Sequence, residues 1–574
     1  MSEQSIAPQH SRSWRLWLVY VLLVLIAAGI VLKLVSLYTM DRDFLQNQGD
    51  ARTMRTVVVP AHRGIITDRN GEALAVSAPV ATVWVNPTKV DLQDPKLTQL
   101  AKLVGKSTSE LQRKIKANLN KQFIYLRRQM APSDAEHIKV LNIAGVNVDR
   151  EYKRYYPAGE VATHLVGFTN IDGQGQEGIE LAYDAALEGE AGKKLVMQDR
   201  LGRTIKNIKL IDEPESGRDV ALSIDLRLQY LAYKELKSAV KSHRADSASV
   251  VIVDIETGEV LAMANQPSYN PNDRKKLTGE QLRNRAMTDV FEPGSTIKPF
   301  TVSAALMSGK YDRDSVIPTA PGYMNVKGKV IKDARNYGDL TMTRIITKSS
   351  NVGVTKLALD LEPEAIHYLL SNVGIGQVPG TGFPGERTGD LRFYGAKRIL
   401  ERAVMSYGYG LSVTAVQLAQ AYSVLANGGV KRPISLLKLN EPAQGRRVIP
   451  DDIASDVVTM METTTQADKG GTGRLAAVFG YRVAGKTGTA KKAARGGYEE
   501  DKYISVFAGI TPASDPKLAV VVMVNNPKGQ QYSGGGVAAP IFSRVAGGAL
   551  RMLNISPDQW PKKMTKELAV NHGN

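Results

Sequence analysis

An uncharged run near the N-terminus is the feature that most constrains how this chain folds. It extends from Leu16 to Leu32, LWLVYVLLVLIAAGIVL, and beyond Lys33 the chain stays largely apolar as far as Tyr38. About 20 apolar residues span the hydrocarbon core of a bilayer, and a single segment there satisfies its backbone polar groups only as a helix. Lys33 can snorkel to the interface when the helix continues to Tyr38. We therefore expect one transmembrane helix at residues 16–38.

The charges beside this run set the expected orientation. Arg12 and Arg15 precede it, whereas the charges at positions 41–43 show no positive excess. The positive-inside rule places residues 1–15 in the cytoplasm and everything beyond about residue 40 outside. A cleaved signal peptide is the competing interpretation, but the run is long for one and no small-x-small cleavage site follows it.

Length and composition limit the remaining possibilities. The chain has 574 residues, which is too many for one compact core, so we expect two or more domains. Its formal net charge of +17 indicates a basic solvated surface or one that faces an anionic membrane or an acidic polymer, and no nucleic-acid-binding motif accompanies it. The absence of cysteine excludes disulfides and cysteine-ligated metals, and we expect neither a cofactor nor a metal.

Residues 39–217 are expected to form a first outer domain without a catalytic constellation of its own. Apolar alternation predicts short strands up to residue 85, and helical spacing predicts helices over 95–142. Asn-Gly at 70–71 predicts a hairpin turn. The polar segment 209–218 is the expected linker. Charged residues of this region are expected to make interdomain ion pairs or hydrogen bonds rather than to do chemistry: Arg63, Asp68, Arg154, Glu177 and Glu180.

Residues 218–560 are expected to form a domain of mixed α and β structure, followed by a tail at 561–574. The segment 248–264 is typical of a β-hairpin, and LAVVVMV at 518–524 is typical of a fully buried strand. Apolar residues at helical spacing predict a helix over 541–553. Helices and an antiparallel sheet in one domain indicate an α+β fold.

A Ser-x-x-Lys motif, Ser295 to Lys298, supplies a candidate nucleophile and base. Pro293-Gly294 precedes it, and Pro299 is tolerated only near a helix start, so Ser295 is expected near the N-terminus of a helix with Lys298 one turn on. A serine hydroxyl needs an adjacent base, and no histidine is near in the sequence. Lys298 is the natural base, provided that desolvation and a neighbouring cation keep it partly neutral.

Two further motifs complete a serine acyl-transfer set. Ser349 and Asn351 are expected on a turn after a helix at 341–348, where they can relay a proton and hold a peptide amide. Lys486 begins Lys-Thr-Gly-Thr, which as an edge strand would present a cation and the hydroxyls of Thr487 and Thr489 to a carboxylate. Gly488 would leave room for substrate to lie against the strand. All three motifs in this order are typical of penicillin-binding proteins and class A β-lactamases.

The chain resembles the class B penicillin-binding proteins, specifically the division-specific septal peptidoglycan transpeptidases of Gram-negative bacteria. The resemblance covers about residues 40–560 and rests on the three motifs together with RGIITDRNG, RYYPAG, GQGQEGIE and YGYGLSVT. It implies a single transmembrane helix and an elongated, dimerisation-like pedestal domain. It also implies a penicillin-binding/β-lactamase-like transpeptidase domain, in which helices flank an antiparallel sheet.

The resemblance also implies roles for individual residues. Ser295 would attack the D-Ala-D-Ala bond of a stem pentapeptide, Lys298 would be its base, and Ser349 would relay the proton to the leaving amine. Asn351 would hold the substrate amide. The terminal carboxylate would be held by Lys486, Thr487 and Thr489, and β-lactams would acylate the same serine. The cleft would be lined by Tyr409, Tyr503 and Tyr532.

The partners that the resemblance implies are peptidoglycan stem peptides, β-lactams, a membrane glycosyltransferase and other septal division proteins, at a bacterial inner membrane. An elongation-specific class B transpeptidase is the alternative that shares all three motifs. A membrane scaffold that binds β-lactams or peptides without turnover is the alternative from a different class. A β-lactamase would need a base that activates water for deacylation, and the sequence identifies none. A bifunctional polymerase would need a further domain, for which the 180 or so residues before the catalytic region show no motif.

Overall fold

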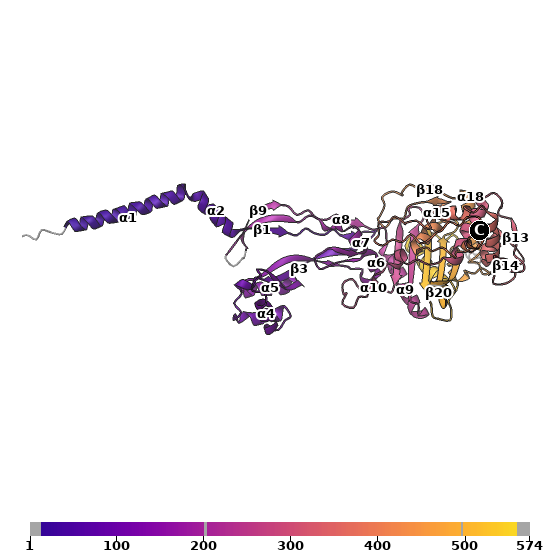
Figure 1. Ribbon diagram of the computed structural model, residues 1–574, viewed down its shortest axis with the longest axis horizontal. Helices are drawn as coiled ribbons and strands as arrows, with labels where there is room; N and C mark the ends of the chain where they lie inside the picture. The colour runs from indigo at the N-terminus through magenta and orange to yellow at the C-terminus, as the bar shows by residue number, and fades with distance from the viewer. Residues whose placement is uncertain (1–12, 200–203, 495–496, 560–574) are drawn as a thin grey trace, which may run out of the picture. The chain divides into compact units, whose positions relative to one another are not determined.

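The computed structural model describes residues 13–199, 204–494 and 497–559, which belong to two compact units (Figure 1). The described part of the smaller unit lies within residues 1–61, 79–151 and 190–215, and the larger unit takes in 62–78, 152–189 and 216–574. Segments 62–78 and 152–189 therefore join the larger unit although they precede residue 217, where the sequence suggested a single division. The chain passes between the units several times.

The apolar run of the smaller unit forms helix α1 (Ser13–Thr39), which confirms the predicted helix. It continues through Lys33, whose ammonium lies 3.6 Å from the carboxylate of Asp41 beyond the helix. No residue of its apolar stretch Trp14–Thr39 is buried against the protein, and its length and composition suffice to cross a membrane. The helix thus fits a single-pass membrane anchor.

A three-stranded antiparallel sheet follows α1 and α2 (Arg42–Thr53) in the smaller unit. It consists of β1 (Met54–Val59), β8 (Gly192–Gln198) and β9 (Thr204–Asp212), in the order β1-β8-β9. The predicted linker at 209–218 is wrong for its first residues, because Leu210 pairs with Lys194 in this sheet. The polar composition of that segment reflects a solvent-exposed strand rather than a loop.

The stretch expected to be helical over residues 95–142 contains a strand as well as helices. Helices α3 (Lys96–Leu103), α4 (Thr108–Lys116) and α5 (Pro132–Leu141) form as predicted. Residues Ile124–Met130, however, form β4, which pairs with β3 (Ala73–Val85). Buried Ile124 and Leu126 alternate there with exposed Tyr125 and Arg127, which is the period of a half-buried strand.

A five-stranded antiparallel sheet forms the centre of the larger unit, as predicted for an α+β fold. Its strands follow the order β12-β11-β21-β20-β19. The predicted hairpin is β11 (Ser247–Asp254) and β12 (Val260–Gln266), and the predicted buried strand is β21 (Leu518–Asn525). Strands β19 (Ala484–Ala494) and β20 (Gly497–Thr511) complete the sheet, and β19 is its edge.

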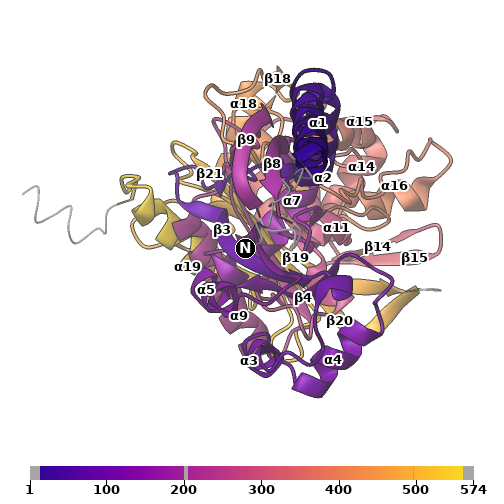
Figure 2. The ribbon, with the colours of Figure 1, turned by 90° about the vertical axis from the view of Figure 1, so that its left-hand side faces the viewer.

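Helices cover both faces of this sheet, which explains why its strands are continuously apolar. On β11, Val250 and Ile252 pack with α9 (Leu226–His243) and α19 (Ala538–Met552). The alternate residues Val251 and Val253 pack with the core that contains α12 (Lys298–Met307) and α17 (Ala415–Ala426). Figure 2 shows α9 and α19 on one side of the strands and α14 (Asn351–Asp360) and α16 (Ile399–Met405) on the other.

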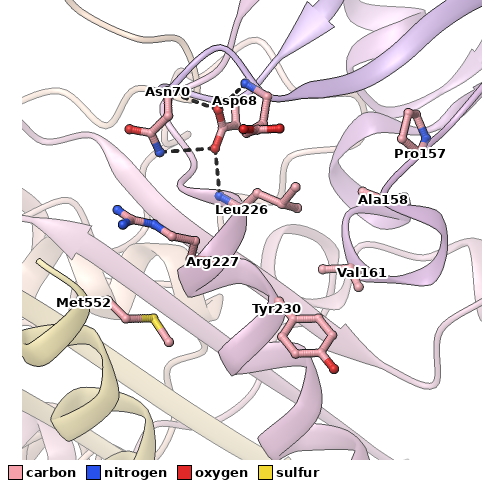
Figure 3. Close-up of a pocket in the computed structure, with 10 residues that line it drawn as sticks. Asp68, Asn70, Pro157, Ala158, Val161, Leu226, Arg227, Tyr230 and Met552 are labelled. Atoms are coloured by element: carbon pink, nitrogen blue, oxygen red, sulfur yellow. Dashed lines mark hydrogen bonds between the residues drawn. The ribbon is translucent and has the colours of Figure 1, made fainter.

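Four of the five charged residues predicted to tie domains together are buried within the larger unit. Glu180 is fully buried and accepts hydrogen bonds from Arg63 Nε at 2.8 Å and Arg154 Nε at 2.6 Å. These ion pairs join segments that all precede residue 217, so they do not link the two domains expected from the sequence. Asp68 does reach across that boundary, because it accepts a hydrogen bond from the backbone N–H of Leu226 at 3.0 Å (Figure 3). Burial raises the pKa of Glu177.

The larger unit contains further helices and strands. They comprise β2 (Ile66–Thr67), α6 (Thr163–Val166), β6 (Phe168–Thr169), β7 (Gly175–Glu177), α7 (Gly178–Ala182), α8 (Asp184–Glu188), β10 (Val220–Ala221), α10 (Gly279–Leu282), α11 (Arg285–Thr288), β13 (Val316–Pro318), β14 (Tyr323–Val326), β15 (Lys329–Lys332), β16 (Asp339–Thr341), α13 (Met342–Lys348), α14 (Asn351–Asp360), α15 (Ala365–Asn372), α16 (Ile399–Met405), β17 (Val430–Lys431), β18 (Arg446–Arg447) and α18 (Asp451–Glu462). Strand β5 (Val146–Tyr155) pairs with β3.

Candidate active site

The turn that carries Ser295 is fixed by hydrogen bonds to its backbone on both sides. Residues Gly294–Ile297 form one 3₁₀ turn that runs directly into α12, so Ser295 lies just before a helix start, as predicted. The N–H of Gly294, which has a φ of +55°, donates to Gly408 O at 3.0 Å. The buried hydroxyl of Tyr422 donates to Thr296 O at 2.9 Å. Ser295 itself is only partly buried, so its hydroxyl remains within reach of a substrate.

Lys298 is the first residue of α12 and is completely buried. Its ammonium donates to Ser349 Oγ at 3.0 Å, to Asn351 Oδ1 at 2.7 Å and to the carbonyl of Ser349. Burial, together with the nearby charge of Lys486, holds the pKa of Lys298 well below that of a free lysine. The sequence predicted that the base must be desolvated and must lie near a second cation. Lys298 is buried and lies near Lys486, so both conditions are fulfilled.

Ser349 ends α13 in the left-handed conformation, with a φ of +57°. That backbone turn directs its hydroxyl between two buried ammonium groups, because Lys298 Nζ and Lys486 Nζ each lie 3.0 Å from Ser349 Oγ. A non-glycine residue in this region stores strain, which is common where a side chain must be held for function. A hydroxyl between two amines can pass a proton from one to the other or onward to a third group.

The edge strand β19 carries the third motif. Lys486 is completely buried, and burial lowers its pKa to about 7. Thr487 Oγ1 donates to Thr472 Oγ1 at 3.1 Å, and Thr489 Oγ1 accepts from the N–H of Gly534 at 2.9 Å. Since Thr489 Oγ1 accepts from Gly534, its own proton remains available to a bound carboxylate.

The space beside Gly488 is filled by other parts of the protein, which the sequence did not indicate. A Cβ at this position would lie 2.7 Å from Pro293 O and 3.0 Å from Thr296 Cγ2. The missing side chain therefore makes room for the turn that carries Ser295, rather than for substrate. Glycine here sets the distance between β19 and the nucleophile.

Asp333 is a residue of this site that sequence reasoning missed. It follows β15 and accepts hydrogen bonds from Ser350 Oγ at 2.6 Å, from the N–H of Asn351 at 2.5 Å and from the N–H of Val352 at 3.0 Å. It thus holds the start of α14, while Asn351 Nδ2 donates to Lys332 O at 2.9 Å. Nothing in the local sequence around Asp333 marks it as a partner of residues 350–352.

The three predicted tyrosines lie around the β19–β20 hairpin. Tyr503 stacks on Tyr532, with ring centroids 4.4 Å apart. Tyr503 also pairs with Lys491 in the sheet, and the ring centroid of Tyr409 lies 6.0 Å from that of Tyr498 in β20. Tyr532 is 49% exposed. The structure therefore brings the three side chains to one region, where Tyr532 in particular is open to contact.

Glu292 is a second residue that the sequence did not single out. Its Oε1 accepts from the N–H of Gly410 at 2.8 Å and from the hydroxyl of Tyr498 at 3.2 Å. Burial raises the pKa of this carboxyl group. Glu292 connects the residues just before Ser295 to the loop of Tyr409 and to β20.

Two family models match this chain, one largely before the predicted domain boundary and one after it. The penicillin-binding protein transpeptidase domain matches residues 248–547, and the penicillin-binding protein dimerisation domain matches residues 58–222. The chain belongs to the class B penicillin-binding proteins. The family assignment and the α+β fold inferred from the sequence are thereby confirmed.

Full-length relatives support the same assignment. The probable peptidoglycan D,D-transpeptidase PbpC of Pseudomonas aeruginosa is 45% identical over 95% of this chain and 96% of its own length. The peptidoglycan D,D-transpeptidase FtsI of Escherichia coli K12 is 44% identical over 98% of this chain and 95% of its own.

Two solved structures of penicillin-binding proteins are similar to this chain. The transpeptidase domain of Burkholderia pseudomallei penicillin-binding protein 3 is 41% identical, with a TM-score of 0.54, over 59% of this chain and 98% of its own. Penicillin-binding protein 3 of Mycobacterium tuberculosis, solved as a complex with aztreonam, is 28% identical, with a TM-score of 0.68, over 88% of this chain and 98% of its own.

Proposed function

We propose that this chain is a serine-type D,D-transpeptidase that cross-links peptidoglycan stem peptides and is acylated by β-lactams. The observation that carries the proposal is the hydroxyl of Ser349, held 3.0 Å from each of the buried amines of Lys298 and Lys486, beside the turn of Ser295. This arrangement supplies a nucleophile, a base with a lowered pKa and a proton relay. The names of the full-length relatives agree with this activity.

The first step forms an acyl-enzyme. The oxygen of Ser295 bonds to the carbonyl carbon of the penultimate D-Ala while its proton passes to the neutral amine of Lys298. The C–N bond to the terminal D-Ala then breaks, and Ser349 delivers a proton to the departing amine. In the second step the amino group of another stem peptide attacks the ester, loses a proton to the same relay and releases Ser295. Each proton taken up is returned, so the enzyme is regenerated.

Substrate would be held from both sides of the nucleophile. Lys486, Thr487 and Thr489 are assigned to the terminal carboxylate and Asn351 to the peptide amide. The backbone N–H groups of Ser295 and Thr489 would stabilise the oxyanion, which is commonly the largest electrostatic contribution to acyl transfer. The stacked Tyr503 and Tyr532, with Tyr409, would contact the ligand beyond the reacting bond.

The proposed setting is division at the septum. The apolar helix α1 would anchor the chain in the bacterial inner membrane, with the N-terminus in the cytoplasm and the catalytic domain in the periplasm, as the flanking charges suggest. Proposed partners are a membrane glycosyltransferase, which supplies the glycan strands, and other septal proteins. The similarity to FtsI supports the septal assignment over the elongation-specific one.

Intact-mass analysis of the full chain in detergent tests the catalytic proposal. Incubation with benzylpenicillin should add one penicilloyl mass that maps to Ser295 and is lost slowly. Ser295→Ala should abolish the adduct with the fold retained, whereas Ser308→Ala, at the end of α12, should be labelled normally. Continued labelling of Ser295→Ala would rule out this nucleophile. Rapid return to the unmodified mass with penicillin consumed would indicate a β-lactamase.

Two further measurements separate the alternatives. Release of D-Ala from a stem-peptide substrate with formation of a cross-linked product distinguishes a transpeptidase from a scaffold without turnover. Depletion of the protein in its host should give filamentous cells if it acts at the septum. Rounded cells would instead favour the elongation-specific assignment.

A further inference from the structure

The backbone just before the nucleophile lies antiparallel to the loop at 408–413. Phe291 and Val413 exchange two backbone hydrogen bonds, each of 2.9 Å. Three residues after Phe291, the N–H of Gly294 donates to Gly408 O at 3.0 Å. A Cβ on Gly408 would lie only 2.0 Å from Gly294 O, so the two backbones approach as closely as glycine permits. The position of the nucleophile turn therefore depends on the position of this loop.

Between these two backbone contacts, a side chain takes over the pairing. Gly410 has a φ of +72°, and its N–H donates to Glu292 Oε1 at 2.8 Å. The carboxyl group of Glu292 thus occupies the place that a backbone carbonyl would take in a regular ladder. Because Glu292 lies three residues before Ser295, this contact holds the approach to the nucleophile against the loop.

The same oxygen of Glu292 also holds β20. The hydroxyl of Tyr498, near the start of β20, donates to Glu292 Oε1 at 3.2 Å. Tyr498 pairs with Ala493 of β19, the strand that carries the third catalytic motif. The ring of Tyr409 packs edge-on against Tyr407 and Tyr498, with centroids 5.7 and 6.0 Å apart. One carboxyl oxygen and one aromatic ring therefore join the loop and the β19–β20 pair to the nucleophile segment.

Two neighbouring residues thus fix the nucleophile segment to the edge of the sheet. Pro293 O lies where a Cβ on Gly488 of β19 would be 2.7 Å away, which is a backbone contact. Glu292 adds a contact made by a side chain, and both of its hydrogen bonds use Oε1. Oε2 is buried and makes no hydrogen bond among the residues that the structure describes. The influence of Glu292 is therefore exerted through one acceptor oxygen.

We propose that Glu292 is a positioning residue for acylation, because it ties Tyr498 and the loop of Tyr409 to the turn of Ser295. This inference rests on the proposed acylation of Ser295, through which Glu292 acts. A misplacement of about 1 Å in a reacting group can cost about a hundredfold in rate, so a contact that holds the turn matters more for the reaction than for the fold. The backbone pairing on either side of Glu292 remains when its side chain is removed.

Acylation of the full chain in detergent by a fluorescent penicillin tests the proposal. A concentration series separates the dissociation constant of the non-covalent complex from the first-order acylation constant. Glu292→Ala should lower the acylation constant about twentyfold, since it loses two hydrogen bonds that each contribute about a factor of five. The dissociation constant should stay within about twofold, because the groups assigned to the ligand remain. Glu362→Ala, which removes an exposed carboxylate between α14 and α15, is the matched control and should change neither constant.

Conservative variants distinguish positioning from a general structural role. Glu292→Gln keeps an oxygen that can accept from both donors, so its acylation constant should return to within about threefold of the wild type. Tyr498→Phe removes one of the two hydrogen bonds and should lower the constant about fivefold. Tyr368→Phe, on α15 and 66% exposed, is its control and should have no effect. In a Glu292→Ala background, Tyr498→Phe should cause no further loss, because the acceptor is already gone.

Several results would overturn the positioning role. A wild-type acylation constant in Tyr498→Phe would do so even if Glu292→Ala were too unstable to assay. An equal loss from Tyr498→Phe with and without Glu292 would show that the tyrosine acts through another contact. A change confined to the dissociation constant would assign Glu292 to ligand binding instead. A wild-type chain that is not acylated would refute the proposed function, whereas normal acylation of the wild type and of both variants would refute only the role of Glu292.

Discussion

Asp333 offers the sharpest test of how the fold sets up the chemistry, because it holds the turn of Asn351 through hydrogen bonds and acts on Lys298 through its charge. Its carboxylate accepts from Ser350 Oγ and from the N–H groups of Asn351 and Val352 at 2.6, 2.5 and 3.0 Å. Asp333→Asn keeps the size of the side chain but removes its charge. The backbone hydrogen bonds then become neutral ones, and the amide faces Ser350 with a donor.

The expected loss follows from the difference between charged and neutral hydrogen bonds. Hydrogen bonds to charged groups contribute about 1 kcal/mol more than neutral ones, so the two backbone contacts together lose about 2 kcal/mol. If the transition state requires the turn in place, this corresponds to about a thirtyfold lower second-order rate constant of acylation, at about 1.4 kcal/mol per factor of ten. The substitution should also change the pH dependence of acylation. The charge of Asp333 raises the pKa of Lys298, so its removal should move the rising limb of the acylation profile to lower pH.

The assay is stopped-flow or quenched acylation of the full chain by a fluorescent penicillin, measured across pH. The matched control is Asp339→Asn, an exposed carboxylate on β16, the next strand along the chain. It should leave both the rate and the pH midpoint unchanged. A wild-type rate with a wild-type midpoint in Asp333→Asn would refute the assignment of Asp333 as the residue that positions Asn351.

Two other substitutions test buried contacts of the larger unit. Glu180→Gln leaves the guanidinium groups of Arg63 and Arg154 buried without their shared anion, so thermal unfolding should show a loss of about 3 kcal/mol, and an unchanged melting temperature would contradict a structural role for this cluster. Gly488→Ala places a Cβ 2.7 Å from Pro293 O, so acylation by penicillin should fall at least tenfold with the circular dichroism spectrum retained, and normal acylation would show that the turn can move aside.

Much of the fold was predictable because its signals are local. The buried strand β21 and the hairpin β11–β12 follow from runs of apolar residues bounded by turn residues, and α1 follows from hydrophobicity alone. The strand β4 was missed because its alternation, buried Ile124 and Leu126 between exposed neighbours, is only a few residues long and lies between amphipathic helices. Short patterns of this kind cannot be distinguished from helix segments by periodicity alone.

The residues of the candidate site were likewise predictable from the sequence only where their signals are local. Its three motifs have fixed internal spacing, so Ser295, Ser349 and Lys486 could be named from the sequence. Asp333 and Glu292 could not, because each acts through a contact made only in the folded chain. Their partners are Asn351, eighteen residues along the chain from Asp333, and Gly410, 118 residues along from Glu292. The role of Gly488 was misassigned for the same reason, since the atoms it avoids, Pro293 O and Thr296 Cγ2, belong to the turn that carries Ser295.

Burying two lysines side by side should cost the fold stability, and that cost is measurable at Lys486. Burial lowers its pKa from 10.5 to about 7, so in the unfolded chain this amine binds a proton more tightly than in the folded one. The penalty is therefore fully present below pH 7 and disappears as the pH rises to 10.5, which makes stability increase with pH over that window. A shift of this size corresponds to about 5 kcal/mol. Lys486→Met, which fills the same space without a charge, should raise the melting temperature at pH 7 by several degrees while acylation is nearly abolished, and the gain should shrink at pH 10. A lower melting temperature at pH 7 would mean that the amine is stabilised by its contact with Ser349 rather than tolerated for catalysis.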